Sequence, residues 1–167
     1  MDKKVLGFFF CLWFFGYYSM AAEQDEQFNA ADPNYQIDFP KDHGPHEKFR
    51  IEWWYFTANL KSESIDDLGI QWTLFKSNLK PDSRKNPQQK NRFWMAHSAI
   101  TTETSHYSEE RFARGNTGQA GVALNPFRAW IDNWSMKGDN ELENIKLESR
   151  GVDFSYSLQL STKMRPV

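Results

Sequence analysis

The stretch FPKDHGPHEKFRIEWWYFTANL, residues 39–60, carries the clearest structural signal in the chain. Gly44 and Pro45 predict a turn, and the alternation that follows predicts a β-strand over residues 51–60. Successive side chains of a strand point to opposite faces, so one face holds a charged pair beside two aromatic rings: Arg50, Glu52, Trp54 and Phe56. The other face holds Ile51, Trp53 and Tyr55. The expected Arg50–Glu52 ion pair is either structural or the polar part of a ligand site.

Further short alternating runs follow, separated by turn-rich segments. We expect strands over residues 69–76, 93–101, 121–124, 129–136, 145–148 and 153–162. Residues 78–91 form a long charged loop with two prolines, and residues 102–116 are polar and loop-like. A series of about seven strands without a helical stripe between them predicts an all-β, antiparallel fold, either a barrel or a sandwich.

The N-terminus has the features of a secretory signal peptide, predicted over residues 1–21. Lys3 and Lys4 precede an apolar run, and Ser19 and Ala21 supply the small residues of a cleavage site. The run is shorter than the roughly 20 residues that span a bilayer. We therefore expect an exported protein, periplasmic or secreted, whose mature form lacks the single cysteine, Cys11.

The mature chain is expected to consist of a flexible leader over residues 22–36 and one domain over residues 37–167. Removing the signal peptide takes away one net positive charge and leaves a formal net charge of −3. That balance indicates no nucleic-acid partner. The chain also lacks the serine-hydrolase elbow, the phosphate loop, the zinc-protease helix motif and the dinucleotide fingerprint.

Residues 42–60 (DHGPHEKFRIEWWYFTANL) resemble the signature of the AttH family, lipocalin-like proteins that include carotenoid 1,2-hydratase. Four later segments resemble further family blocks in the same order: GIQWTLFK (69–76), WMAHSA (94–99), GQAG (118–121) and AWIDNWS (129–135). The resemblance implies a lipocalin-like barrel without a cofactor, the first of two such halves. Family members continue past a K-x-P-V segment into a second barrel. Because this chain stops at KMRPV (163–167), we expect the domain to be incomplete relative to the family.

Two histidines precede the first strand. His43 and His46 lie three residues apart, and a metal site there would need a third ligand such as His97 or Asp132, so the spacing alone does not predict one. The histidines could instead hydrogen-bond the backbone and fix the entry to the strand, or act on a ligand. His97 stands among small apolar residues, either as a satisfied core residue or beside a ligand.

Alternation also places Trp130, Asp132 and Trp134 on one face. A carboxylate between two indoles has its pKa raised, and a protonated acid suits the addition of water to an isoprenoid double bond. Asp132 could equally accept a structural hydrogen bond from an indole or an arginine. Asp132 and His97 are the candidate catalytic residues for an activity resembling that of carotenoid 1,2-hydratase.

These patterns favour a protein that binds an apolar or isoprenoid-like ligand in an aromatic-lined cavity. The candidate ligand-binding residues are His43, His46, Glu52, Trp53, Trp54, Tyr55, Trp72, Trp94, Trp130 and Trp134. The alternatives are a hydro-lyase and a truncated copy without function. The expected partners are an apolar small molecule, a second lipocalin-like domain, and a peripheral membrane or ABC-transporter component.

Overall fold

The computed structural model describes residues 27–63, 65–80, 91–139 and 141–161. The predicted signal peptide, the first part of the leader, most of the charged loop and the KMRPV segment lie outside these ranges. Among the helices of the described part, none has the length and apolar character needed to cross a membrane.

Within the described residues, one short 3₁₀ helix precedes nine strands. The elements are η1 (Lys41–His43), β1 (Ile51–Ser62), β2 (Ile65–Asn78), β3 (Arg92–Thr101), β4 (His106–Arg114), β5 (Ala120–Ala123), β6 (Phe127–Ile131), β7 (Trp134–Gly138), β8 (Asn144–Arg150) and β9 (Ser155–Ser161). Within each sheet, every strand pairs antiparallel with its neighbour in the sequence, and the sheets are ordered β1-β2-β3-β4 and β5-β6-β7-β8-β9. The prediction of an all-β, antiparallel fold is confirmed.

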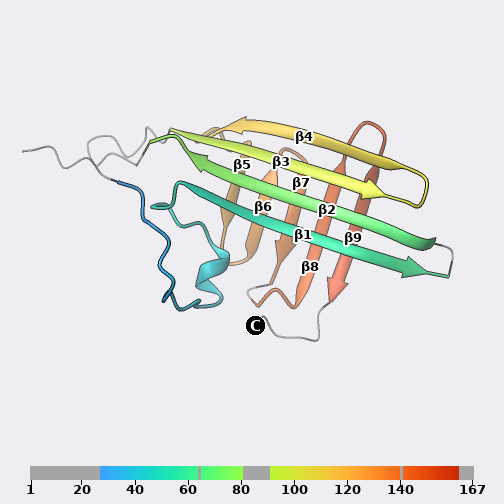
Figure 1. Ribbon diagram of the computed structural model, residues 1–167, viewed down its shortest axis with the longest axis horizontal. Coiled ribbons are helices and arrows are strands. Elements are labelled where there is room, and N and C mark those ends of the chain that lie inside the picture. Colours follow the sequence, from blue (N-terminus) through green and yellow to red (C-terminus); the bar gives the residue numbers. More distant parts are fainter. Residues whose placement is uncertain (1–26, 64, 81–90, 140, 162–167) are drawn as a thin grey trace, which may run out of the picture.

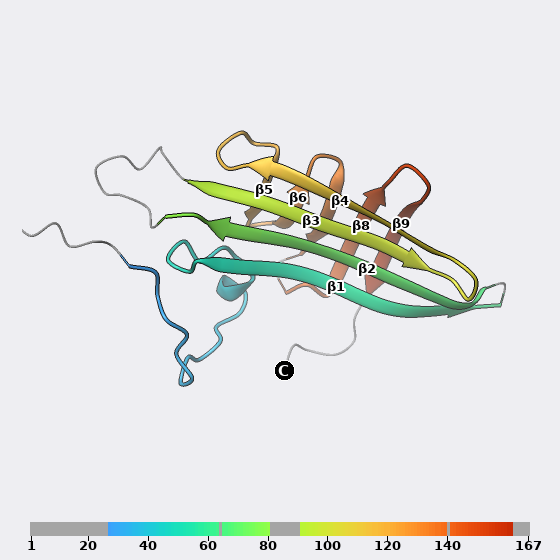
Figure 2. The ribbon, with the colours of Figure 1, turned by 45° about the horizontal axis from the view of Figure 1, so that its top comes forward.

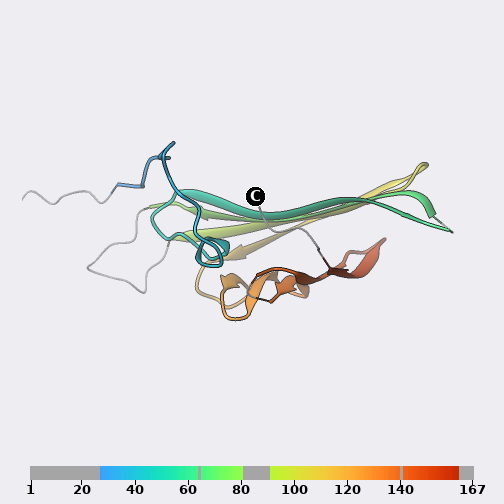
Figure 3. The same ribbon diagram turned by 90° about the horizontal axis from the view of Figure 1, so that it is seen from below.

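The two sheets pack face to face. Figure 1 shows the shorter strands β5–β9 crossing behind the long strands β1–β4, and Figure 3 shows the two layers edge-on. No strand pairing joins the sheets within the ranges described above, so this part of the chain is two stacked layers. The far ends of the β1–β2 and β3–β4 hairpins extend past β9 (Figures 1 and 2).

The core lies between the layers and comes from alternate residues of each strand. Trp72 and Leu74 of β2 pack against Ile131, Trp134 and residues beside them in the second sheet, and all four are fully buried. Burying an aliphatic side chain of this size contributes about 1.5–3 kcal/mol. The space between the sheets is therefore filled by large side chains.

Two expectations about the strands were wrong. The segment expected as one strand over residues 129–136 is the β6–β7 hairpin, which turns at Asp132 and Asn133. Asp132 has a φ of 51°, a left-handed conformation that aspartate and asparagine tolerate better than other residues with side chains. The segment expected as a loop over residues 102–116 contains β4, whose polar residues suit an edge strand that faces solvent.

Candidate functional site

The side of the four-stranded sheet that faces away from the second sheet carries a row of apolar side chains across every strand. Trp53 pairs with Phe75, Phe75 with Met95, and Met95 with Phe112. Cross-strand partners lie on the same face of a sheet, so the row is continuous. Trp53 is 56% exposed and Phe112 is 49% exposed. The Trp53 and Phe75 ring centroids are 6.5 Å apart.

Neighbouring residues widen this row into a patch. Tyr55 is 63% exposed beside Trp53, and Phe93 stacks on Phe112 at 5.7 Å between centroids. We call this patch the aromatic face; it consists of Ile51, Trp53, Tyr55, Phe75, Phe93, Met95 and Phe112. Soluble monomers rarely expose large contiguous apolar patches unless these bind something. The patch therefore is a candidate binding surface.

His97 lies at the edge of the aromatic face and not in the core. Its ring packs edge-on against Phe75 at 5.6 Å, and its Nε2 is 3.7 Å from a carboxylate oxygen of Glu110. Its side chain is 43% exposed. The small residues around it in the sequence point alternately inward and outward, so they do not enclose it.

A charged cluster anchors the loop before β1 to the same sheet. Lys76 of β2 is fully buried, and its Nζ contacts the Glu52 carboxylate and donates to the His46 carbonyl oxygen at 2.9 Å. The same carboxylate accepts the His46 backbone N–H at 2.9 Å and lies 2.6 Å from His46 Nδ1. Glu52 thus binds a strand and a loop together.

The expected Arg50–Glu52 pair is wrong. Arg50 is exposed, and the partners of Glu52 are His46 and Lys76. Lys76 was missed, although alternation with Trp72 and Leu74 along β2 places it on the buried face. A buried lysine needs an anionic partner, and Glu52 is its direct cross-strand neighbour.

The cluster extends from His46 toward the surface. His46 Nε2 lies 3.1 Å from Asp42 Oδ1, and Asp42 also accepts the Tyr35 hydroxyl at 2.9 Å and the Asp38 backbone N–H at 2.7 Å. The Asp38 hydrogen bond, with the smaller effects of His46 and Tyr35, lowers the pKa of Asp42 to about 2. Burial acts to lower the pKa of His46, but the hydrogen bonds and charges of Asp42 and Glu52 outweigh it and raise that pKa. The imidazolium form of His46 is therefore favoured.

His43 has the opposite environment. Its ring stacks on Phe39 at 4.2 Å and meets Phe127 of the second sheet at 6.2 Å. Burial lowers its pKa against a smaller opposing effect of Asp42, and its buried Nε2 has no hydrogen-bond partner among the described residues. Its carbonyl oxygen accepts the Trp54 indole N–H at 2.9 Å. These contacts correspond to the interpretation in which the histidines fix the entry to β1, and Figure 2 shows η1 beside that entry.

The remaining candidate tryptophans occupy different environments. Trp72, Trp94 and Trp134 are buried in the core between the sheets. Trp54 is half-buried at its edge, 6.2 Å from Trp94 between ring centroids. Trp94 also lines a hollow of about 250 Å³ with Ala120, Gly121 and Val122 of the second sheet, whereas Trp72 and Trp134 are fully buried. Their role as ligand-binding residues stays a prediction.

Asp132 does not lie between two indoles. It is exposed at the β6–β7 turn, where Gln119 donates to it at 2.9 Å and Arg111 lies 3.7 Å away. Trp134 points inward, while Trp130 lies on the outer face under the Arg128 guanidinium, 4.6 Å from its ring centroid. The tight turn reverses the chain, so the two tryptophans take opposite faces.

In the described part of the chain, no three histidine, cysteine, aspartate or glutamate side chains are arranged to hold a metal ion. Two features of the four-stranded sheet are the charged cluster, whose groups bind each other, and the aromatic face, whose side chains are exposed or half-buried. Of the two, the aromatic face is the one available to a ligand.

Comparison with known proteins identifies the family to which this fold belongs. One solved structure, a protein from Nitrosomonas europaea described as an AttH, superposes with a TM-score of 0.64 at 24% sequence identity. The match covers 81% of this chain and 40% of that one, so the chain spans less than half of the relative. No curated protein sequence matches the chain. The profile of the AttH-like family matches residues 30–167. The chain therefore belongs to the AttH-like family.

Proposed function

We propose that this protein is an exported binding protein whose aromatic face takes an apolar, isoprenoid-like ligand. The observation that carries the proposal is the row Trp53–Phe75–Met95–Phe112, in register across four strands, whose outer members Trp53 and Phe112 are exposed and whose inner members are half-buried. Neighbouring strands lie about 4.8 Å apart, so the row is roughly 14 Å long. An extended, flat hydrocarbon fits a surface of that shape.

The buried tryptophans favour the outer face over the interior as the binding surface. Trp72 and Trp134 are fully buried against neighbours, and a ligand between the sheets would have to displace them. Displacing packed core side chains costs several kcal/mol, as deletion of such side chains does. Contact with Trp53 and Tyr55 needs no such rearrangement and removes apolar surface from water.

The hydratase alternative has no observation that favours it over binding. Its candidate acid, Asp132, is exposed at a turn beside Arg111 and Gln119. Export is supported by the features of residues 1–21, which lie outside the described ranges.

A titration with all-trans-retinol tests the proposal. We expect saturable binding, followed by retinol fluorescence, that Trp53→Ala weakens by about tenfold, equivalent to about 1.4 kcal/mol. Trp130→Ala is the matched control, because it removes an indole from the outer face of the other sheet. Unsaturable binding, or equal losses in the two variants, would refute the proposal.

A further inference from the structure

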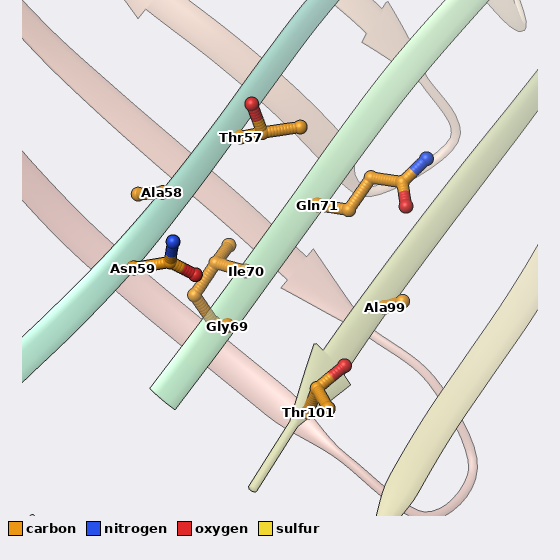
Figure 4. Close-up of a pocket in the computed structure, with 8 residues that line it drawn as sticks. All are labelled: Thr57, Ala58, Asn59, Gly69, Ile70, Gln71, Ala99 and Thr101. Carbon is orange, nitrogen blue, oxygen red and sulfur yellow. The ribbon is translucent and has the colours of Figure 1, made fainter. Parts of the chain in front are cut away.

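The outer face of the four-stranded sheet changes character along its strands. Beyond Tyr55, the next cross-strand rows are Thr57–Gln71–Ala99 and Asn59–Gly69–Thr101. These rows line a hollow of about 260 Å³, and Figure 4 shows its residues coming from three neighbouring strands. A second hollow of about 460 Å³, which includes Asp67 and Glu103, shares Asn59, Gly69 and Thr101 with the first. The aromatic face thus continues into a polar groove.

Small residues form the floor of this groove, where Ala99 is buried and Gly69 is half-buried. Gly69 has no side chain, and Ala99 beside it has only a methyl group. A β-carbon placed on Gly69 would have Thr101 Cβ, at 3.4 Å, as its nearest neighbour, so the backbone would accept a larger residue there. The hollow is therefore not imposed by a need for glycine, and a substitution can fill it without breaking the strand.

The side chains around the hollow are neutral and can both donate and accept hydrogen bonds. Thr57, Asn59 and Gln71 are exposed and make no side-chain hydrogen bond to any other described residue. Thr101 Oγ1 pairs with His106 Nδ1 at 2.8 Å. Amides and hydroxyls offer both roles at adjacent positions, which matches vicinal hydroxyl groups.

The surrounding charges disfavour an anionic group. Recognition of phosphate or carboxylate uses Arg or Lys, and the first hollow has neither among its lining residues. Lys61 nearby pairs with Asp67 at 3.0 Å, and Glu103 adds a second carboxylate at the adjoining hollow. Carboxylates accept hydrogen bonds from hydroxyls but repel anions.

We propose that the hollow binds a neutral sugar, and that the ligand of this face is an amphiphile with an apolar tail on the aromatic face and a glycosyl head beside Gln71. The inference rests on the proposed function for the tail. Trp53 and Thr57 are four residues apart along β1, roughly 14 Å, so head and tail can bind the same face at once. Tyr55 lies between the two regions with 63% of its surface exposed, where a sugar ring can pack on its aromatic face.

The test compares two detergents with the same twelve-carbon chain. The full chain is titrated with n-dodecyl β-D-maltoside and with dodecyldimethylamine oxide, each below its critical micelle concentration, by calorimetry. We expect the maltoside to bind about tenfold more tightly, and the Asn59→Ala/Gln71→Ala double variant to lose that preference while keeping its affinity for the amine oxide. Gly69→Val, which fills the hollow, should have the same effect.

Ser157→Ala/Gln159→Ala is the matched control, because it removes exposed polar groups from the outer face of the second sheet. Displacement of the maltoside by free maltose would show that the hollow accepts a sugar alone; no displacement would show that it accepts the sugar as the head of an amphiphile. Equal affinities of the wild type for the two detergents, or a preference that survives in both hollow variants, would overturn the inference. Failure of the proposed function appears separately, as retinol and amine oxide binding that Trp53→Ala does not change.

Discussion

At the scale of single residues, Lys76 explains how the loop before β1 is held. A fully buried ammonium group is tolerated because its N–H groups donate to the Glu52 carboxylate and to the His46 carbonyl oxygen. Glu52 is in turn shared with the His46 ring and backbone. Glu52, His46 and Lys76 are one another's hydrogen-bond and ion-pair partners. Removing the side chain of Lys76 therefore leaves the Glu52 carboxylate with fewer partners.

Lys76→Met keeps the length of the side chain and removes its charge. We expect it to lower the free energy of unfolding by about 2–4 kcal/mol, because the largely buried Glu52 carboxylate, 13% exposed, loses one of its two cationic partners. Lys137→Met, which breaks the exposed pair with Glu148, should cost less than about 1 kcal/mol. Urea unfolding at neutral pH measures both. Equal costs would contradict the buried-cluster account.

His46 makes stability depend on pH. Its pKa is raised in the folded protein, so its contribution is fully present below the unfolded value of 6.5 and is lost as the pH rises through the folded value. Asp42, with its pKa lowered to about 2, contributes above its unfolded value of 3.8 and loses that contribution as the pH falls toward 2. The window in which both act therefore lies between these two groups' unfolded values.

The variant His46→Gln isolates this effect from that of His43, whose lowered pKa gives the opposite trend. We expect the difference in unfolding free energy between wild type and His46→Gln to be larger near pH 5.5 than near pH 8.5, as measured by urea unfolding. A difference that is constant, or that grows with pH, would show that the Asp42 and Glu52 carboxylates do not stabilise the imidazolium.

At the scale of elements, alternation predicted much of the first sheet. It located β1, β2 and β3, and it separated Trp54 from Trp53 and Tyr55 correctly. Alternation cannot say which face is buried, because both faces of β1 carry aromatic residues. Only the packing of the second sheet, through long-range contacts, makes one face the core.

The strands of the second sheet were harder to predict because they are short and closely joined. The strands β6 and β7 have five residues each and join through two residues, so their combined pattern looks like one strand. A tight hairpin reverses the chain and shifts which residues share a face. The candidate site around Asp132 followed from that error. Of the aromatic face, the sequence analysis named only Trp53 and Tyr55 as ligand-binding candidates, because the exposure of the other members cannot be read from the residue type.

The backbone conformation of the β6–β7 turn leads to a prediction about stability. At the φ of 51° of Asp132, we expect Asp132→Val to lower the free energy of unfolding by about 1–2 kcal/mol, because β-branched side chains are strained there. Asp132→Gly should change it by less than about 0.5 kcal/mol. Thermal or urea unfolding of both variants is the measurement. A large loss in the glycine variant would instead assign the stability to the contacts with Gln119 and Arg111.

At the scale of the whole molecule, two layers divide the aromatic residues into two populations. Trp72 and Trp134 fill the space between the sheets, whereas Trp53 and Tyr55 lie on the outer face of the four-stranded sheet. Stability is expected to depend on the first population and binding on the second. A ligand on the outer face should therefore contact Trp53 and Tyr55 and leave Trp72 and Trp134 untouched.

The indole N–H signals of the ¹⁵N-labelled protein, recorded during a titration with all-trans-retinol, test this directly. Signals are assigned by single Trp→Phe variants. We expect the Trp53 signal to shift saturably while those of the buried Trp72 and Trp134 stay in place. Shifts of Trp72 and Trp134 with an unchanged Trp53 would place the ligand between the sheets and contradict the claim that the outer aromatic face is the binding surface.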